Sequence, residues 1–308
     1  MATAINVRNI SINQARAWRE GLSIFLALTK IRISLFATLS TATGYLLETG
    51  KITVHLLVPS AAVFLLACGS CAFNQYQERE IDQWMERTKS RPIPSGRLSP
   101  ETALWISIGL IFSGALILFF GAGVLALALG LFAVLWYNLI YTPLKQKTAF
   151  AAVPGALVGA IPPALGWVAG GGTLLDPRIG GLALFFFIWQ IPHFWLLLLD
   201  SSKDYENAGL PSITRFFSTR QIERIVFIWL LSTGASALTF PSLGLVHFRP
   251  VCLFLLVATA WFLRGAIHFF SSSPRPSAFR IAFMKLNAYA LAVLLLLSVD
   301  RFLFVVWS

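Results

Sequence analysis

The sequence predicts an all-helical protein that crosses a membrane many times. Hydrophobic residues make up 57% of its 308 residues and charged residues only 12%, and the mean hydropathy is +0.74. A soluble domain of this length has too little interior to hide so much apolar surface. Apolar runs of about 20 residues, the length that a helix needs to cross a bilayer, recur along the chain. No polar stretch is long enough to form a second core, so we expect residues 1–308 to form a single integral-membrane domain.

Nine apolar runs define the expected membrane spans. The polar segment before them, residues 1–21, lacks the apolar core and cleavage site of a secretory signal. Its arginines suit a mitochondrial presequence as well as a cytoplasmic tail, and we interpret it as a tail. The fourth run ends near Pro143, which breaks helices. The nine expected spans are Leu22–Leu47, Val54–Tyr76, Thr102–Phe120, Gly123–Tyr141, Ala149–Val168, Gly180–Leu199, Ile222–Phe240, Val251–Phe270 and Ala282–Phe304.

The basic residues predict the orientation of the chain. If the N-terminus is inside, every Lys and Arg falls on an inner segment except Lys51, Arg178, Arg249 and Arg301. Inner loops of membrane proteins carry this excess of basic residues. We therefore expect a cytoplasmic N-terminus and an outer C-terminus, in a bacterial cytoplasmic (inner) membrane. The net charge of +11 does not indicate nucleic-acid binding, because the charges lie in short loops between spans.

Three polar residues continue the second span at its inner end. Asn74, Glu78 and Asp82 are spaced by four residues, which places them on one helical face with about 6 Å of rise between neighbours. Their oxygen atoms suit a hard cation such as Mg²⁺. Charges at a helix end often only face water. However, each charge within the apolar region costs about 2.5–3.5 kcal/mol on insertion scales, so we favour a binding site.

A second acid pair, Asp200 and Asp204, follows the sixth span with the same spacing. The two acid motifs lie four spans apart, which predicts two similar four-helix halves plus a ninth helix. Facing each other, the motifs can hold two Mg²⁺ ions around one diphosphate. We expect Asp82 and Asp204 to be essential for catalysis. The candidate metal ligands are Asn74, Glu78, Asp82, Asp200 and Asp204.

Basic residues from several loops surround the acids, as a metal–diphosphate substrate requires. Lys145 follows the fourth span, where a cation opposes the charge that develops on a departing diphosphate, so we assign it a catalytic role. Lys30 and Arg32 lie near the inner end of the first span, and snorkelling to the membrane surface accounts for one of them. Ordinary inner-loop charges are the alternative. The candidate diphosphate ligands are Lys30, Arg87, Arg91, Lys145 and Lys203.

The sixth span carries the segment Trp-Gln-Ile-Pro-His-Phe-Trp, residues 189–195. His193 lies about two helical turns from Asp200 and can hydrogen-bond a substrate or ligate iron. A buried histidine is more commonly a packing residue. We expect His193, Gln190 and Trp195 to form the acceptor site. Asn287, an amide in the last span, is expected to form a hydrogen bond between helices.

The segment Asn74–Asp82 resembles the first acid-rich motif of the UbiA superfamily of intramembrane prenyltransferases, Asn-x-x-x-Asp-x-x-x-Asp. Here Glu78 takes the middle position, where its carboxylate still suits a metal. Four further segments are similar to the haem O synthase branch of the superfamily, although Ile31 replaces a common proline and Asp200 is closer to the general superfamily motif. They are Leu-Thr-Lys-x-Arg ending at Arg32, Tyr-Thr-Pro-Leu-Lys ending at Lys145, Gly-Ala-Ile-Pro-Pro ending at Pro163, and Lys-Asp-Tyr-x-x-Ala-Gly-x-Pro ending at Pro211.

This resemblance implies nine transmembrane helices around a central cavity. It implies Mg²⁺-dependent transfer of a farnesyl group from farnesyl diphosphate to a vinyl group of haem B, giving haem O. The implied partners are farnesyl diphosphate, haem B, membrane lipid, and haem A synthase or other oxidase assembly factors. Two alternatives remain open: a related prenyltransferase with another aromatic or tetrapyrrole acceptor, and a transporter with inverted repeats. A transporter places its polar groups near the bilayer midplane, whereas these acids lie at one membrane face.

Overall fold

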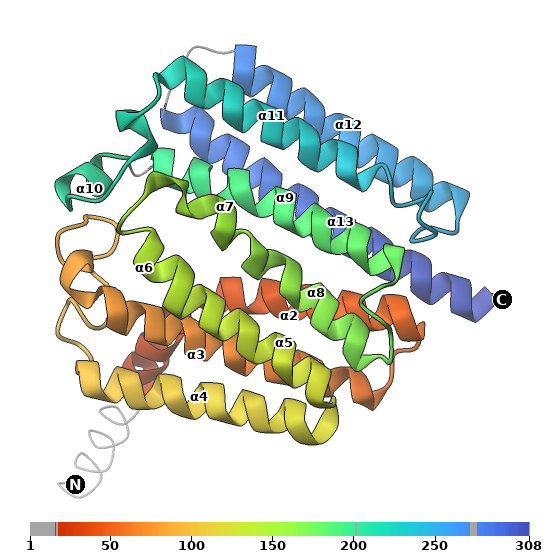
Figure 1. The fold of residues 1–308 in the computed structure, drawn as a ribbon, viewed down its shortest axis with the longest axis horizontal. Coiled ribbons are helices and arrows are strands. Elements are labelled where there is room, and N and C mark those ends of the chain that lie inside the picture. The colour runs from red at the N-terminus through yellow and green to blue at the C-terminus, as the bar shows by residue number, and fades with distance from the viewer. Residues whose placement is uncertain (1–15, 17, 201, 272–275, 308) are drawn as a thin grey trace, which may run out of the picture.

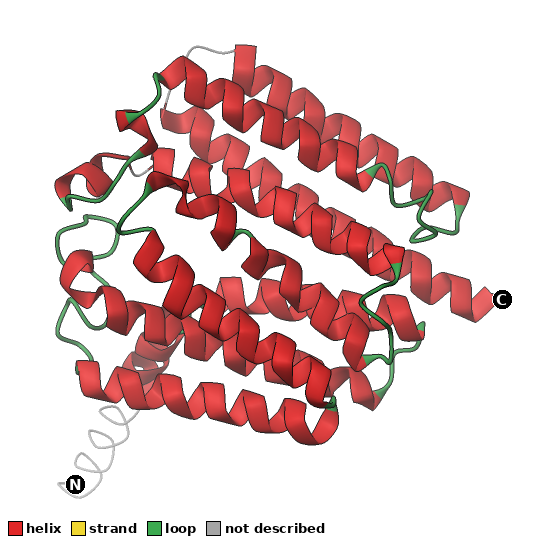
Figure 2. Cartoon of the chain, in the orientation of Figure 1, coloured by secondary structure: helices red, strands yellow, loops and turns green. Residues whose placement is uncertain are grey.

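The computed structural model describes residue 16 and residues 18–200, 202–271 and 276–307, without the side chains of Ser202, Lys203, Glu206, Pro276 and Ser277. Every regular element in these ranges is a helix, and most of the long helices run side by side (Figures 1 and 2). The predicted all-helical class is therefore confirmed. Most of the expected tail, residues 1–21, lies outside the described residues.

The helices follow the expected apolar runs, with several breaks inside them. Short 3₁₀ segments (η1, η3, η4) and one π-helical segment (η2) interrupt or extend the α-helices. The elements are α2 (Ile31–Thr49), η1 (Val54–Leu56), α3 (Leu57–Asp82), α4 (Pro100–Gly121), α5 (Val124–Leu135), η2 (Trp136–Tyr141), α6 (Thr142–Leu144), η3 (Ala149–Ala151), α7 (Ala152–Gly155), α8 (Leu157–Ala169), α9 (Pro177–Asp200), α10 (Ser202–Asn207), η4 (Ile213–Arg215), α11 (Thr219–Ala237), α12 (Arg249–Ser271) and α13 (Pro276–Trp307).

Within the described ranges, seven helices are long and apolar enough to cross a membrane, or eight if a bent first pair counts as one span. The chain is thus an integral multi-pass membrane protein, but the predicted count of nine is not confirmed. The seventh expected run corresponds to α11, which is absent from this set. Arg220, Glu223 and Arg224 all fall within its first two turns, so its apolar part is short.

The first expected span is bent by 60°, between Trp18–Leu28 and Ile31–Thr49. Lys30 lies at the bend with φ 46° and ψ 54°, a left-handed conformation that non-glycine residues rarely adopt. Gln75 of α3 donates hydrogen bonds to the carbonyls of Ala27 and Leu28, at 2.8 and 2.9 Å. These carbonyls lose their helical partners at the break, so Gln75 stabilises the bend.

Helices α2 and α8 touch through their backbones. A Cβ atom on Gly44 would lie 2.0 Å from the carbonyl oxygen of Pro163, and one on Gly166 would lie 1.9 Å from that of Thr41. Only glycine fits at these two positions. Helix α2 therefore packs directly on α8 as well as on α3.

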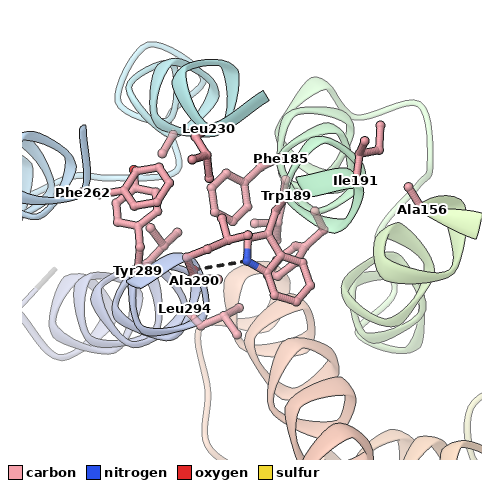
Figure 3. Packing of buried hydrophobic residues seen from close by; sticks show 14 of the residues in the cluster. Ala156, Phe185, Trp189, Ile191, Leu230, Phe262, Tyr289, Ala290 and Leu294 are labelled. Atoms are coloured by element: carbon pink, nitrogen blue, oxygen red, sulfur yellow. Dashed lines mark hydrogen bonds between the residues drawn. The ribbon is translucent and has the colours of Figure 1, made fainter. Parts of the chain in front are cut away.

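The two largest of three hydrophobic clusters among the described residues hold most of the long helices together. The larger one joins α9, α11, α12 and α13, and Figure 3 shows Trp189 and Phe185 of α9 turned toward Tyr289 and Ala290 of α13. The indole Nε1 of Trp189 donates to the carbonyl of Leu286 at 3.2 Å, the dashed line in that figure. The smaller cluster joins α3, α4, α5 and α8 through Ala62, Val63, Leu66, Leu118, Ala126 and Leu165.

Asp176 caps the start of α9, at the end of the helix opposite the acid motif. Its Oδ1 accepts from the backbone N–H of Arg178 at 2.8 Å, and its Oδ2 from Arg178 Nη2 at 2.6 Å. These side-chain hydrogen bonds hold the pKa of the Asp176 carboxyl below its usual range. The guanidinium also lies 4.8 Å from the ring centroid of Trp167. Arg178, one of the few predicted outer cations, is therefore engaged within the fold.

Candidate active site at the end of α3

The first acid motif lies on one continuous helix. α3 extends six residues beyond the expected limit of its apolar run and ends at Asp82. Asn74, Glu78 and Asp82 are all buried, with exposed fractions of 0%, 6% and 2%. Three buried polar groups in one row require partners, and the structure provides them from the first span, from α6 and from the loop after α3.

Asn74 connects the bend in the first span with α6. Its Oδ1 accepts a hydrogen bond from Lys30 Nζ at 2.8 Å. Its Nδ2 donates to Thr142 Oγ1 at 3.1 Å. The left-handed backbone of Lys30 thus places its ammonium group against the first residue of the acid motif. Its predicted role as a diphosphate ligand stays a prediction.

Both acids of this motif are paired with predicted diphosphate ligands. Lys145 forms an ion pair with Glu78. Arg91 Nη1 lies 2.5 Å from Asp82 Oδ2 and 3.9 Å from Glu78 Oε2. These cations neutralise the two acids, so a metal or an anion that binds here must replace one of these partners.

The loop after α3 folds back over the end of the helix. Met85 and Ile93 are buried, with exposed fractions of 3% and 7%, and anchor the loop. Thr88 Oγ1 donates to the carbonyl of Asp82 at 3.0 Å and satisfies one of the free carbonyls of the helix end. This anchoring brings Arg91 beside acids that lie nine and more residues earlier in the chain.

The second acid motif meets this loop. Asp204 of α10 accepts a hydrogen bond at Oδ2 from the backbone N–H of Arg87, at 3.0 Å. Figure 1 shows α10 and the loop after α3 on the same side of the molecule. Asp200 is exposed at the last position of α9. The side chain of Lys203 lies outside the described residues.

A small cavity of about 30 Å³ lies where the two motifs meet. That volume matches roughly one water molecule and is too small for a diphosphate in the present conformation. Its walls include predicted metal and diphosphate ligands, two residues that follow Asp204, and Gln146. They are Glu78, Asp82, Arg87, Arg91, Lys145, Gln146, Tyr205 and Leu210.

The residues around this cavity fit Mg²⁺ by their donor chemistry. Glu78 and Asp82 present buried carboxylates, and hard cations favour such oxygen ligands. No group of three or more His, Cys, Asp or Glu side chains in the described ranges is close enough to hold a metal. A complete ligand set therefore needs movement of Asp204 toward α3, or oxygens from the substrate. The sequence-based metal ligands stay predictions.

A π-helical segment places aromatic rings beside the acids, which the sequence did not indicate. Asn138, in the middle of η2, donates to the carbonyl of Ser70 at 3.0 Å, and Gln77 Nε2 donates to the carbonyl of Asn138 at 2.9 Å. These bonds fix the segment on α3. π-helical turns often occur at functional sites. The amides of Asn138 and Gln77 meet across the two helices, a contact that no local sequence pattern contains.

Tyr141 ends this segment and stacks between two neighbours. Its ring lies 4.9 Å from that of Phe194 on α9 and 5.7 Å from that of Tyr137. Lys145 Nζ lies 5.7 Å from the centroid of the Tyr141 ring. A Cβ on Gly155 would lie 2.3 Å from this ring, so the glycine provides the space for it.

His193 is held at the interface of α9 and α13. Its Nδ1 lies 3.0 Å from Asn287 Oδ1, which confirms the predicted interhelical hydrogen bond of Asn287. The rings of Trp189 and Phe283 both lie 4.8 Å from the imidazole, and that of Phe194 lies 5.9 Å away. His193 thus contacts the same aromatic stack that reaches Lys145 and Glu78.

The two other predicted acceptor residues lie on different sides of α9. Trp195 is buried and meets Trp229 of α11 at 6.5 Å. Gln190 faces α8, where a Cβ on Gly159 would lie 2.8 Å from its Oε1. Of the three residues, only His193 has a described contact with the stack that leads to the acids.

Comparison with known proteins identifies a family. The profile of the UbiA prenyltransferase family matches residues 36–289. The chain is 40% identical over 221 residues to protoheme IX farnesyltransferase of Geobacter sulfurreducens, covering 72% of this chain and 82% of the relative. It is 32% identical over 275 residues to the enzyme of the same name from Oleidesulfovibrio alaskensis, covering 89% and 95% of the two chains.

Solved structures share the fold. A digeranylgeranylglyceryl phosphate synthase superposes with a TM-score of 0.71 at 18% identity, over 91% of this chain and 98% of that one. A UbiA homologue from Archaeoglobus fulgidus bound to GPP and Mg²⁺ superposes with a TM-score of 0.60 at 15% identity, over 88% and 99%. These likenesses show that the helical arrangement of this chain is shared with both proteins.

Proposed function

The chain belongs to the UbiA prenyltransferase family, and we propose that it transfers a farnesyl group from farnesyl diphosphate to a vinyl group of haem B. The product is haem O, which terminal oxidase assembly uses. The observation that carries this proposal is the similarity, over most of the chain, to relatives named protoheme IX farnesyltransferase. The site geometry supports it, because a buried acid–base cluster is joined by an aromatic stack to a histidine.

The donor diphosphate binds at the end of α3 in this proposal. Asn74, Glu78 and Asp82 would hold Mg²⁺ together with Asp204, and Asp200 is a further candidate. When bound, Mg²⁺ supplies positive charge that stabilises the diphosphate as it leaves. Once Glu78 and Asp82 bind the metal, their ion pairs with Lys145 and Arg91 are broken, and these two cations can bind the phosphate oxygens. Lys30, Arg87 and Lys203 complete the proposed set of cations.

The residues of the chain then govern the transfer. The allylic carbon–oxygen bond breaks and its electron pair leaves with the diphosphate, whose growing charge Lys145 and Arg91 oppose. The π electrons of the haem vinyl group form the new carbon–carbon bond. Water adds to the resulting cation and loses a proton, which leaves a hydroxyl group. The faces of Tyr141, Phe194 and Trp189 can stabilise the cations, and the membrane interior keeps bulk water from the first one.

The acceptor lies along α9 in this proposal. His193 is about 11 Å along the helix from Asp200, a gap that a porphyrin can bridge with one vinyl edge at the allylic carbon. Gln190 and Trp195 are the other proposed acceptor residues, on flanking faces of the same helix. His193 contacts Phe194, and Phe194 contacts Tyr141. These contacts support an acceptor site along α9, because they lead from the imidazole toward the acids.

The proposed topology has nine spans, a cytoplasmic N-terminus and an outer C-terminus, in the bacterial cytoplasmic membrane. Helix α11 provides the additional span, because it packs alongside α9 and α12 although charges occupy its first turns. In this topology the acid motifs lie on the cytoplasmic side of the membrane, at the mouth of the proposed central cavity. Farnesyl diphosphate would enter from that side. Membrane lipid surrounds the bundle, and haem A synthase or other oxidase assembly factors are the proposed protein partners.

One experiment tests the proposed acceptor. The chain is expressed in a bacterial host that lacks its own haem O-forming enzyme, and the extracted haems are analysed by mass spectrometry. We expect a haem heavier than haem B by one farnesyl and one hydroxyl group, absent from cells that express Asp82→Asn. Transfer of farnesyl to another aromatic or tetrapyrrole acceptor, with unmodified haem, would instead support the alternative prenyltransferase.

A further inference from the structure

The hydrogen bonds of Asn287 fix which nitrogen of His193 carries a proton. Asn287 Nδ2 donates to the carbonyl of Phe283, one turn earlier on α13, at 2.7 Å. This bond orients the amide, because the carbonyl oxygen of Phe283 can only accept, so the NH₂ group of Asn287 must face it. The Oδ1 atom is thereby turned toward His193 Nδ1, at 3.0 Å. Since Oδ1 is an acceptor only, Nδ1 carries the proton.

The second ring nitrogen is left with a lone pair. Among its contacts with the described part of the chain, His193 has aromatic rings and the Asn287 amide but no carboxylate to favour the charged imidazolium. In the neutral ring with a proton on Nδ1, Nε2 is an acceptor. His193 is half-buried. Its Nε2 has no hydrogen-bond partner in the described ranges, and the atom is not completely enclosed, so a ligand can reach it.

The position of the ring is also fixed by its neighbours. Trp189, one turn before His193 on α9, donates to the carbonyl of Leu286 on α13. Two successive turns of α9 are therefore tied to two successive residues of α13, and the imidazole cannot rotate without breaking one of these ties or displacing Phe283. Histidines that ligate metals are held in this way, by an acceptor on the nitrogen that does not ligate.

We propose that Asn287 is a positioning residue that holds His193 in the Nδ1-protonated form, so that Nε2 is offered to the acceptor, as a ligand to iron or as a hydrogen-bond acceptor. This inference rests on the proposed haem farnesyltransferase function. It gives the last span a role in acceptor binding, in addition to its packing against α9 and α12.

The first test compares substitutions of Asn287 in the full-length purified protein. Asn287→Leu removes the acceptor, and we expect haem affinity, measured from the Soret band, and farnesylation of haem to fall about 10- to 100-fold. Binding of farnesyl diphosphate, measured by calorimetry, stays unchanged. Asn287→Asp keeps an acceptor for Nδ1 and restores haem binding to within about threefold of the native protein, since a carboxylate serves the same second-sphere role.

Tyr289→Phe is the matched control. It removes a different interhelical hydrogen bond of α13, from the Tyr289 hydroxyl to Thr259 Oγ1 at 2.8 Å, with no described contact to His193. We expect it to lower stability but not haem affinity. Equal losses of haem affinity in Asn287→Leu and Tyr289→Phe would show that Asn287 only supports packing, and would overturn the proposal.

A second test does not require Asn287 variants to fold. In His193→Gly, added imidazole can replace the side chain, donating from one nitrogen to Asn287 and presenting the other. 1-Methylimidazole has no N–H to donate. We expect imidazole to restore haem binding at a concentration at least about tenfold lower than 1-methylimidazole does. Equal rescue by both would refute positioning by Asn287. If the native protein neither binds nor farnesylates haem, the proposed function itself fails, which is a different result.

Discussion

Arg91 Nη1 lies 2.5 Å from Asp82 Oδ2, in the wall of the cavity between the two acid motifs. The guanidinium comes from a loop and the carboxylate from the end of α3, and both side chains are largely buried, with exposed fractions of 17% and 3%. A charged pair in this position is stable only while each partner has a counter-charge. A metal for Asp82 and a phosphate group for Arg91 would replace both partners at once. The ion pair therefore marks where metal and diphosphate are expected to bind.

The first prediction concerns the acids. Asp82→Asn and Asp204→Asn keep the size of each side chain but remove the charge that a divalent cation requires. We expect either change to abolish prenyl transfer, while the protein still inserts into membranes and elutes as a homogeneous species. Glu86→Gln is the control, since Glu86 is exposed and paired with Lys89 at 2.6 Å. Full activity of Asp82→Asn with Mg²⁺ present would refute the assignment.

The second prediction concerns the cations. Arg91→Ala and Lys145→Ala remove groups that would bind the phosphate oxygens and stabilise the leaving diphosphate. We expect a higher KM for farnesyl diphosphate, together with a fall in kcat of about 100-fold. Lys147→Ala is the matched control, because Lys147 is exposed two residues beyond Lys145. If all three variants keep native kinetics, the cations serve only as positive charges of inner loops.

The third prediction concerns Mg²⁺ itself. Chelation with EDTA is expected to stop release of diphosphate from farnesyl diphosphate, and added Mg²⁺ to restore it. Glu78→Gln weakens one oxygen ligand without emptying the site, so we expect half-maximal activity to require more Mg²⁺. The measurement is a titration of activity against free Mg²⁺ for both proteins. An unshifted curve would remove Glu78 from the proposed ligands.

The fourth prediction concerns the packing of α2 on α8. A Cβ atom at Gly166 would lie 1.9 Å from a backbone oxygen, so the helices must separate in Gly166→Ala. We expect overpacking to cost about 1–3 kcal/mol of unfolding free energy and to lower Tm. Gly180→Ala is the control, since nothing lies within 4 Å of a Cβ there. A similar Tm for the two variants would contradict the close contact.

Periodicity alone predicted correctly that Asn74, Glu78 and Asp82 lie on one helix, because their spacing fits a helix wherever that helix packs. Their role as metal ligands stays a prediction. The bend at Lys30 could not be predicted in this way. No glycine or proline stands at the break, and the free carbonyls there are satisfied by Gln75 from another helix. A pattern in the sequence around Lys30 cannot reveal that Gln75, 45 residues later, lies beside the break.

The aromatic stack was missed for a similar reason. Tyr141 ends a π-helical segment that is tied to α3, and Gly155 leaves the space in which its ring meets Phe194. Each of these conditions depends on residues more than ten positions away. Asn287 was easier to interpret, since a lone amide in an apolar span needs a partner on a neighbouring helix. Its partner, His193, became clear only from the packing of α9 on α13.

The last prediction concerns His193. The imidazole contacts Phe194, which stacks on Tyr141, above which lies the ammonium group of Lys145. A substrate lying along this stack would reach from the imidazole to the departing diphosphate. We therefore expect His193→Ala to lose farnesylation of haem and to retain binding of farnesyl diphosphate, since no predicted donor ligand is changed.

Two measurements separate these effects: haem absorbance spectra of the purified proteins, and binding of the donor by calorimetry. His55→Ala is the control, because His55 is exposed at the opposite end of α3 from the acid motif. We expect this variant to match the native protein in both measurements. If His193→Ala binds and farnesylates haem normally, the hydrogen bond to Asn287 serves packing alone, and the porphyrin must contact another helix. The stack from Phe194 to Lys145 would then shelter only the farnesyl chain.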